Sequence, residues 1–243
     1  MPIKPVADED RIIEADRIPG LVIPDMLRFL CDESLAFSDE GSPFSARMDE
    51  GDARLTVVVG QNASGKSLLH RMVEGLAHTH GIEPISLSIR ERTGSNESPG
   101  SMRRQFMYGF EHRDSTGNTS LRTTRKAFET MEGRTGPAML LLDEPEMGLS
   151  EGFAHAFGEL IGRLSSTPPA AGCGVMVISH SRALVRGLEA GLGSRPGFVM
   201  TGDGPDTLQQ WLDNPETRTI EDLEALAGIS SARRDAARSF LGI

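Results

Sequence analysis

Three short apolar runs constrain the fold of this chain more than any other feature of its sequence. They are 55–59 ("LTVVV"), 138–142 ("AMLLL") and 175–178 ("VMVI"), and they do not alternate with charged residues. A strand that is buried on both faces has this pattern, whereas a half-buried strand alternates apolar and polar residues. Helical patterns lie between the runs, at 67–80 and 151–164. This order predicts an α/β fold with a mostly parallel sheet flanked by helices.

Two weaker strands complete the predicted sheet, one at Pro84–Ile89 and an edge strand at Gly197–Met200. The length of 243 residues and the apolar content of 38% suit a single domain. We expect an N-terminal strand and helix region at 1–54, a core at 55–181, and a strand with helices at 182–243. The tail is predicted to form two or three short helices that close the core, with Thr219 and Asp222 as a capping pair.

Composition points to the cytoplasm and away from membranes. The apolar runs are far shorter than a membrane span, and the first twenty residues are acidic and interrupted by prolines, unlike a signal peptide. Cys31 and Cys173 lie far apart without metal-ligand spacing, so we expect two buried thiols in a reducing compartment.

The loop after the first apolar run carries a pattern with specific chemistry. Gly60–Ser67 reads "GQNASGKS" and fits G-x-x-x-x-G-K-[ST] between a predicted strand and a predicted helix. Glycines let successive backbone N–H groups turn inward and form an anion nest at the helix start. We expect Lys66 to reach the outer phosphates of a nucleotide and the Ser67 hydroxyl to ligate Mg²⁺. The predicted binding residues are Gly60, Gln61, Asn62, Ala63, Ser64, Gly65, Lys66, Ser67 and Leu68.

Polar residues follow the other two apolar runs directly. Asp143 and Glu144 come after the second run, and Ser179 and His180 after the third. Ligands of such sheets bind beyond the carboxyl ends of the strands, so these side chains are expected at one site. We expect Asp143 to hold Mg²⁺, usually through water, and Glu144 to take a proton from the water that attacks the γ-phosphate. His180 is expected to contact the γ-phosphate or that water.

These motifs, in this order, resemble the ATP-binding-cassette type of ATPase, a class of P-loop NTPase, over roughly 55–181. "GQNASGKS" looks like its phosphate loop, "LLLDEP" like its Walker B strand and "VISHS" like its switch-histidine loop. "EMGLS" is similar to the segment after Walker B in stand-alone chromosome-maintenance, DNA-repair and overcoming-lysogenization-type ATPases. The resemblance implies ATP as ligand and a head-to-head homodimer with ATP sandwiched between subunits. Ser115 and Gly117, at the start of a predicted helix, would then form the signature motif that meets the partner's ATP; a plain capped helix is the alternative.

Other readings stay open. No glutamine follows the predicted second strand as the family pattern requires, although Gln105 could replace it. A P-loop kinase for a small molecule or nucleoside would need an acceptor pocket and paired arginines, which Arg103 and Arg104 could imitate. A nucleotide-gated scaffold with negligible hydrolysis is a third possibility. We also expect a protein partner in a larger complex.

The charge distribution allows nucleic acid as a further partner. The chain carries a net charge of −10, which argues against coating nucleic acid with the whole surface. Within 90–134, nine basic side chains stand against six acidic ones, so this segment has a net charge of +3. Arg103, Arg104, Arg122 and Arg125 are the residues expected to meet phosphate there; a solvated basic face is the alternative.

Overall fold

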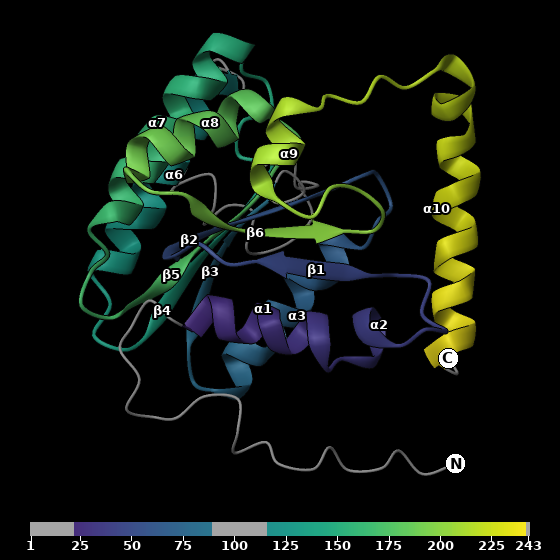
Figure 1. Cartoon of the computed structure of the whole chain (residues 1–243). Coiled ribbons are helices and arrows are strands. Elements are labelled where there is room, and N and C mark those ends of the chain that lie inside the picture. The colour runs from purple at the N-terminus through teal and green to yellow at the C-terminus, as the bar shows by residue number, and fades with distance from the viewer. Residues whose placement is uncertain (1–21, 89–115, 242–243) are drawn as a thin grey trace, which may run out of the picture.

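The structure is a computed structural model that describes residues 22–88 and 116–241 (Figure 1). Its centre is a six-stranded sheet in the order β1-β6-β2-β5-β4-β3. The strands are β1 (Ala46–Asp49), β2 (Asp52–Gly60), β3 (Glu83–Leu87), β4 (Ala138–Asp143), β5 (Gly172–Ile178) and β6 (Pro196–Thr201). All pairs are parallel except β1 with β6, which is antiparallel. The predicted α/β fold with a mostly parallel sheet is confirmed.

Helices cover both faces of this sheet. On one face lie α1 (Val22–Asp32), α2 (Leu35–Ser38) and α3 (Lys66–Thr79); on the other lie α6 (Thr116–Glu132), α7 (Glu151–Ser166), α8 (Arg182–Leu192) and α9 (Leu208–Asp213). Successive strand residues point to opposite faces. In β4, Leu140 and Leu142 therefore join the core under α6–α8, whereas Met139 and Leu141 join the core under α1 and α3. Both faces being buried is why the three central strands are continuous apolar runs.

The prediction of an edge strand at Gly197–Met200 is wrong in its position. β6 lies between β1 and β2, and all six of its residues are buried. The cause is β1, a four-residue strand that covers the edge. Its sequence, "ARMD", alternates apolar and charged residues over too short a span to be distinguished from a loop. The predicted strand Pro84–Ile89 is found as β3, and Ile89 lies outside the described residues.

α7 and α8 pack with their backbones in direct contact. Four glycines form this seam, Gly158 and Gly162 on α7 and Gly187 and Gly191 on α8. A Cβ added at Gly187 would lie 2.0 Å from the backbone oxygen of His155, and one at Gly191 would lie 2.0 Å from that of Glu159. No side chain larger than hydrogen fits there, so the two helices share one closely packed interface.

The tail departs from its prediction. α9 does close the core, because Leu208, Trp211 and Leu212 are buried in the same cluster as the apolar residues of α8, on the same face of the sheet. α10 (Ile220–Leu241) is instead one long helix, and none of its described side chains is buried. Figure 1 shows α10 standing beside the sheet, joined to α9 by an extended connection. The predicted capping pair is present.

The two bonds of that pair are reciprocal. The Thr219 amide donates to Asp222 Oδ2 over 2.9 Å, and the Asp222 amide donates to Thr219 Oγ1 over 3.2 Å. Both cysteines are buried free thiols, as expected, and burial raises the pKa of Cys31 to about 12. Among the described helices, none is long and apolar enough to cross a membrane.

Candidate functional site

Strand register brings the predicted site residues to one edge of the sheet. Val58 of β2 pairs with Ile178 of β5, and Ile178 also pairs with Asp143 of β4. The segments that follow these strands therefore emerge beside one another. We name them the glycine-rich loop (60–67, after β2), the β4 turn (144–150) and the β5 loop (179–181).

The glycine-rich loop is held in a curled shape at the start of α3. Gly60, Ala63 and Gly65 have positive φ values of 154°, 62° and 103°. A Cβ at Gly60 would lie 2.2 Å from Thr201 Oγ1, so this position requires glycine. Thr201 Oγ1 donates to the Val59 carbonyl over 3.1 Å and lies 2.6 Å from Ser64 Oγ. These hydroxyls fix the loop in front of the first turn of α3, whose free N–H groups favour an anion.

Lys66 lies inside this loop. Its side chain is buried, and Nζ donates to the carbonyl oxygens of Gly60 over 3.0 Å and Gln61 over 2.7 Å. Burial lowers the pKa of Lys66 to about 8, while the nearby charges of Glu144 and Asp143 oppose that shift. The lysine is therefore mostly protonated at neutral pH. Its charge is bound to the loop carbonyls and is close enough to Glu144 and Asp143 to interact with both.

Asp143 and Glu144 lie half-buried at the end of β4. The Glu144 amide donates to the Ile178 carbonyl over 2.9 Å, which ties the β4 turn to the end of β5. Burial raises the pKa of Glu144, Asp143 raises it further, and Lys66 opposes both. A carboxylate with a raised pKa is a stronger base, which is the property needed to take a proton from water.

His180 faces Glu144 across this edge. Its Nε2 lies 3.5 Å from Glu144 Oε1, and the side chains are 40% and 31% exposed. Burial lowers the pKa of His180 to about 4, and the positive charge of Lys66 acts in the same direction. The imidazole is therefore neutral at neutral pH, with one nitrogen able to donate and one able to accept a hydrogen bond.

The oxygen atoms present suit Mg²⁺ in part. The Ser67 hydroxyl is exposed in the first turn of α3, and the Asp143 carboxylate lies at the strand end. Within the described ranges, no group of three or more His, Cys, Asp or Glu side chains could hold a metal. Mg²⁺ commonly uses one or two protein oxygens and takes its other ligands from water and phosphates. The residues present fit that type of site and not a metal cage made by protein alone.

The remaining predicted residues have different positions. Leu68 packs its side chain against the core under α1 and α3, so only its backbone is available to a ligand. Gly117 lies in the first turn of α6, and a Cβ there would lie 2.5 Å from Leu149 Cδ2 of the β4 turn. Ser115, Arg103, Arg104 and Gln105 lie outside the described residues.

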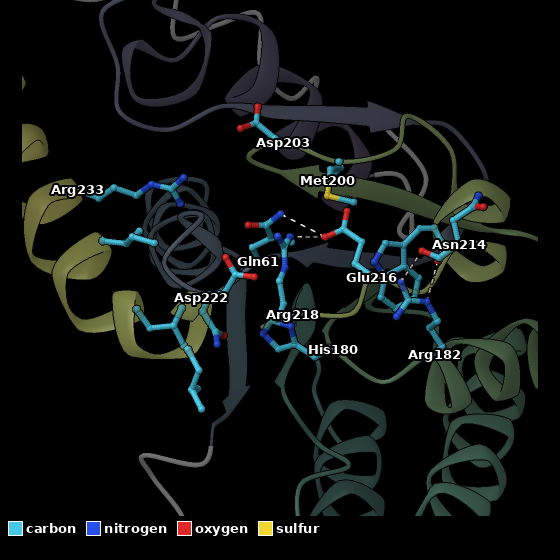
Figure 2. Close-up of a pocket in the computed structure, with 17 residues that line it drawn as sticks. Gln61, His180, Arg182, Met200, Asp203, Asn214, Glu216, Arg218, Asp222 and Arg233 are labelled. Carbon is cyan, nitrogen blue, oxygen red and sulfur yellow. Dashed lines mark hydrogen bonds and ion pairs between the residues drawn. The ribbon is translucent and has the colours of Figure 1, made fainter. Parts of the chain in front are cut away.

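A cleft of about 460 Å³ opens beside the glycine-rich loop (Figure 2). One wall is formed by Gly60–Asn62 and His180, and α10 lies opposite with Leu223, Leu226 and Ile229. Arg233 of α10 crosses to the loop, where Nη1 donates to the Ala63 carbonyl over 2.9 Å.

Two further arginines line the same cleft. Arg182 lies 4.6 Å from the centroid of the Trp211 ring and donates through Nε to the Trp211 carbonyl. Arg218 forms an ion pair with Glu216. The cleft therefore combines guanidinium groups with the carboxylates of Asp203, Glu216 and Asp222 and an aliphatic helix face, next to the candidate phosphate site.

Sequence reasoning missed two residues of this edge. Thr201 follows a predicted strand, but its place beside Gly60 depends on the pairing of β6 with β2, which the sequence does not indicate. Glu146 gives no signal either, because a carboxylate in a turn is normally solvated. In the structure it turns inward, and Ser179 Oγ donates to its Oε1 over 2.5 Å.

Comparison with known proteins adds no assignment. No family model matches the sequence, and no curated protein matches it.

Proposed function

We propose that this protein is a Mg²⁺-dependent ATPase that binds ATP at the glycine-rich loop and hydrolyses it. One observation carries the proposal. An anion nest with a buried lysine, two half-buried carboxylates and a neutral histidine emerge together from three adjacent parallel strands. Hydrolysis of a phosphoanhydride needs these groups, namely donors for the phosphate charge, oxygens for a cation and a base for water.

Each residue has a role in this proposal. Lys66 exchanges the carbonyls of Gly60 and Gln61 for the β- and γ-phosphates. Glu144 takes the proton of the attacking water, and neutral His180, 3.5 Å away, orients that water or the γ-phosphate. Ser67 and Asp143 would hold Mg²⁺, which neutralises phosphate charge when bound.

The wider function is proposed from the family resemblance of residues 55–181. We propose that ATP brings two copies together head to head, and that hydrolysis separates them and drives or switches a larger cytoplasmic complex. A role in DNA repair, or in a mobile-element or phage-defence complex, is favoured.

The substitution Glu144→Gln tests this function most directly. Glutamine keeps the size of the side chain but has no basic oxygen. We expect ATP hydrolysis to fall by roughly 10²–10⁴-fold, the usual worth of a positioned base. ATP affinity should persist, and a dimer should accumulate, since the γ-phosphate then stays in the closed state. Phosphate release assays, titration calorimetry and light scattering measure the three quantities.

Lys66→Ala and ADP are the controls. Lys66→Ala removes the buried cation that contacts the Gly60 and Gln61 carbonyls, so ATP affinity itself should fall steeply in calorimetry. ADP should leave Glu144→Gln monomeric. If Glu144→Gln hydrolyses ATP at the parent rate, the assignment of Glu144 as the base is wrong. If the variant has the same molecular mass with ATP as with ADP, the proposed ATP-dependent dimer is wrong as well.

The cleft favours one second candidate, a P-loop kinase for a small molecule. It adjoins Gly60–Asn62, and its lining combines Arg182, Arg218 and Arg233 with Asp203, Glu216 and Asp222, so it offers both donors and acceptors to a small polar substrate. Analysis of the reaction products distinguishes the two functions. An ATPase releases ADP and phosphate in buffer alone, whereas a kinase makes ADP only when an acceptor is supplied.

A further inference from the structure

Glu146 is a buried carboxyl that the proposed reaction does not use. It lies in the β4 turn, whose backbone is closed by bonds from Met147 N to the Glu144 carbonyl and from Leu149 N to the Glu146 carbonyl. The residue is half-buried, and its carboxyl lies against the end of β5, where Oε1 meets Ser179. Burial raises its pKa, and the Ser179 hydroxyl opposes that shift. A carboxyl in a surface turn would normally be solvated, so its inward position needs a reason.

The carboxyl is tied to the β5 loop by a chain of two hydrogen bonds. Ser179 Oγ donates to Glu146 Oε1 over 2.5 Å, and the Ser181 amide donates to Ser179 Oγ over 2.9 Å. Ser179 is fully buried, and its amide donates to the Val58 carbonyl over 3.1 Å. Ser181 in turn caps α8, where its Oγ accepts from the Leu184 amide.

His180 therefore stands between two anchored serines. Its backbone is held on one side by Ser179 and on the other by Ser181, while its imidazole projects to Glu144. Glu146 lies two residues after Glu144 on the other segment. The carboxyl thus bridges the two segments that carry the candidate base and the candidate histidine.

The bridge has a cost that packing alone does not explain. Among the described residues, Glu146 Oε2 is a buried atom without a well-aligned hydrogen-bond partner, although the backbone N–H groups of Glu146 and His180 lie close enough to lower the pKa of this carboxyl. A half-satisfied buried carboxyl is less favourable than an apolar side chain of similar size.

We infer that Glu146 is a positioning residue that, through the Ser179 hydroxyl, holds His180 at its working distance from Glu144. The inference rests on the proposed ATPase function for the reaction that the positioning serves. Glu146 touches neither ATP nor the attacking water in this role. It acts by fixing the imidazole, and a displacement of about 1 Å at such a site can slow turnover by about 10²-fold.

The experiment compares Glu146→Ala, Glu146→Gln and Ser179→Ala. Alanine at either position breaks the bridge, so kcat for ATP should fall by about 10- to 100-fold while KM and ATP affinity stay within about twofold. Glutamine keeps an oxygen that accepts from Ser179, so Glu146→Gln should retain a kcat near that of the parent. Glu151→Ala, an exposed acidic residue at the start of α7, is the matched control and should retain the parent kcat.

A second readout needs no activity. Imidazole NMR signals of His180 and amide hydrogen exchange at Ser181 should change in Glu146→Ala and Ser179→Ala, and remain as in the parent in Glu151→Ala. If the parent hydrolyses no ATP, the proposed function fails, and these signals still test the bridge. Unchanged signals in both alanine variants overturn the inference, and so does a parent-like kcat in both. If Glu146→Ala does not fold, Ser179→Ala and Glu146→Gln decide.

Discussion

Glu144 holds its backbone in the left-handed region, with φ of 47°. For a residue with a side chain this conformation costs on the order of 1–3 kcal/mol, and such residues concentrate at functional sites. Two bonds hold it there, from its own amide to the Ile178 carbonyl and from Met147 N to its carbonyl. The conformation cannot be read from the sequence, because glutamate shows no preference for it. Gly60 and Gly65 are the opposite case, since their identity alone indicated an unusual backbone.

The low pKa of His180 leads to a prediction on stability. Its pKa is about 4 in the folded protein, against about 6.5 for an unperturbed histidine, with Lys66 and Glu144 as the charged groups that face it. Between these values the unfolded chain binds more protons, so this histidine makes the free energy of unfolding rise with pH from about 4 to about 6.5. In urea unfolding across pH 4–8, the free energy of unfolding should rise less with pH in His180→Gln than in the parent.

The exposed His78 supplies the reference for that comparison. His78→Gln removes a histidine of α3 that stands in solvent. If His180→Gln and His78→Gln give the same dependence of stability on pH, the lowered pKa of His180 is refuted.

At the scale of elements, burial decides what the sequence could predict. β2, β4 and β5 are buried on both faces, so each appears as a continuous apolar run, and the chemistry at their ends was predicted with them. The wrong position of β6 has the same origin, because β1, which covers it, is a short half-buried strand: a strand was expected within 1–54, but its place could not be predicted. α10 was misjudged because Leu223, Leu226 and Ile229 look like a core-facing stripe, whereas they line the cleft.

The glycine seam between α7 and α8 gives a prediction about stability. Gly187→Ala would place a Cβ 2.0 Å from the His155 carbonyl oxygen, so the helices would have to move apart. Overpacking of this kind costs about 1–3 kcal/mol or more, and urea unfolding should show it as a lower midpoint. Gly75→Ala in α3 is the matched control. A Cβ there meets nothing within 4 Å, so alanine should stabilise the protein by about 0.5–1 kcal/mol. If the two substitutions change the free energy of unfolding equally, α7 and α8 are not in direct backbone contact at Gly187.

At the scale of the whole molecule, α10 is separate from the layered body. Its side-chain link to the glycine-rich loop is the bond from Arg233 to Ala63, and Phe240 lies near Gly41 at the other end. Ile220 and Leu223 are 71% and 66% exposed. The helix therefore contributes little apolar burial to the rest of the chain.

Removing α10 should accordingly leave the body folded. We expect a chain truncated after Asn214 to unfold cooperatively, with a loss of about 0.5–1.5 kcal/mol, the worth of one hydrogen bond. A chain truncated after Asp206 also loses α9 with Leu208, Trp211 and Leu212, each worth about 1.5–3 kcal/mol when buried. Urea unfolding followed by circular dichroism compares the two. A large loss in the first truncation would mean that α10 belongs to the core.

The seam of α7 and α8 has a mechanical consequence. α7 starts directly after the β4 turn and α8 directly after the β5 loop, and there is no layer of side chains between them that could slide or compress. A shift of Glu144 that displaces the start of α7 would also displace α8 and His180, because the two helices would move as one rigid body. With 16 residues, α7 is about 24 Å long. Its far end at Ser166 would move whenever the site moves, so the occupied and empty states would differ in shape at the opposite edge of the sheet.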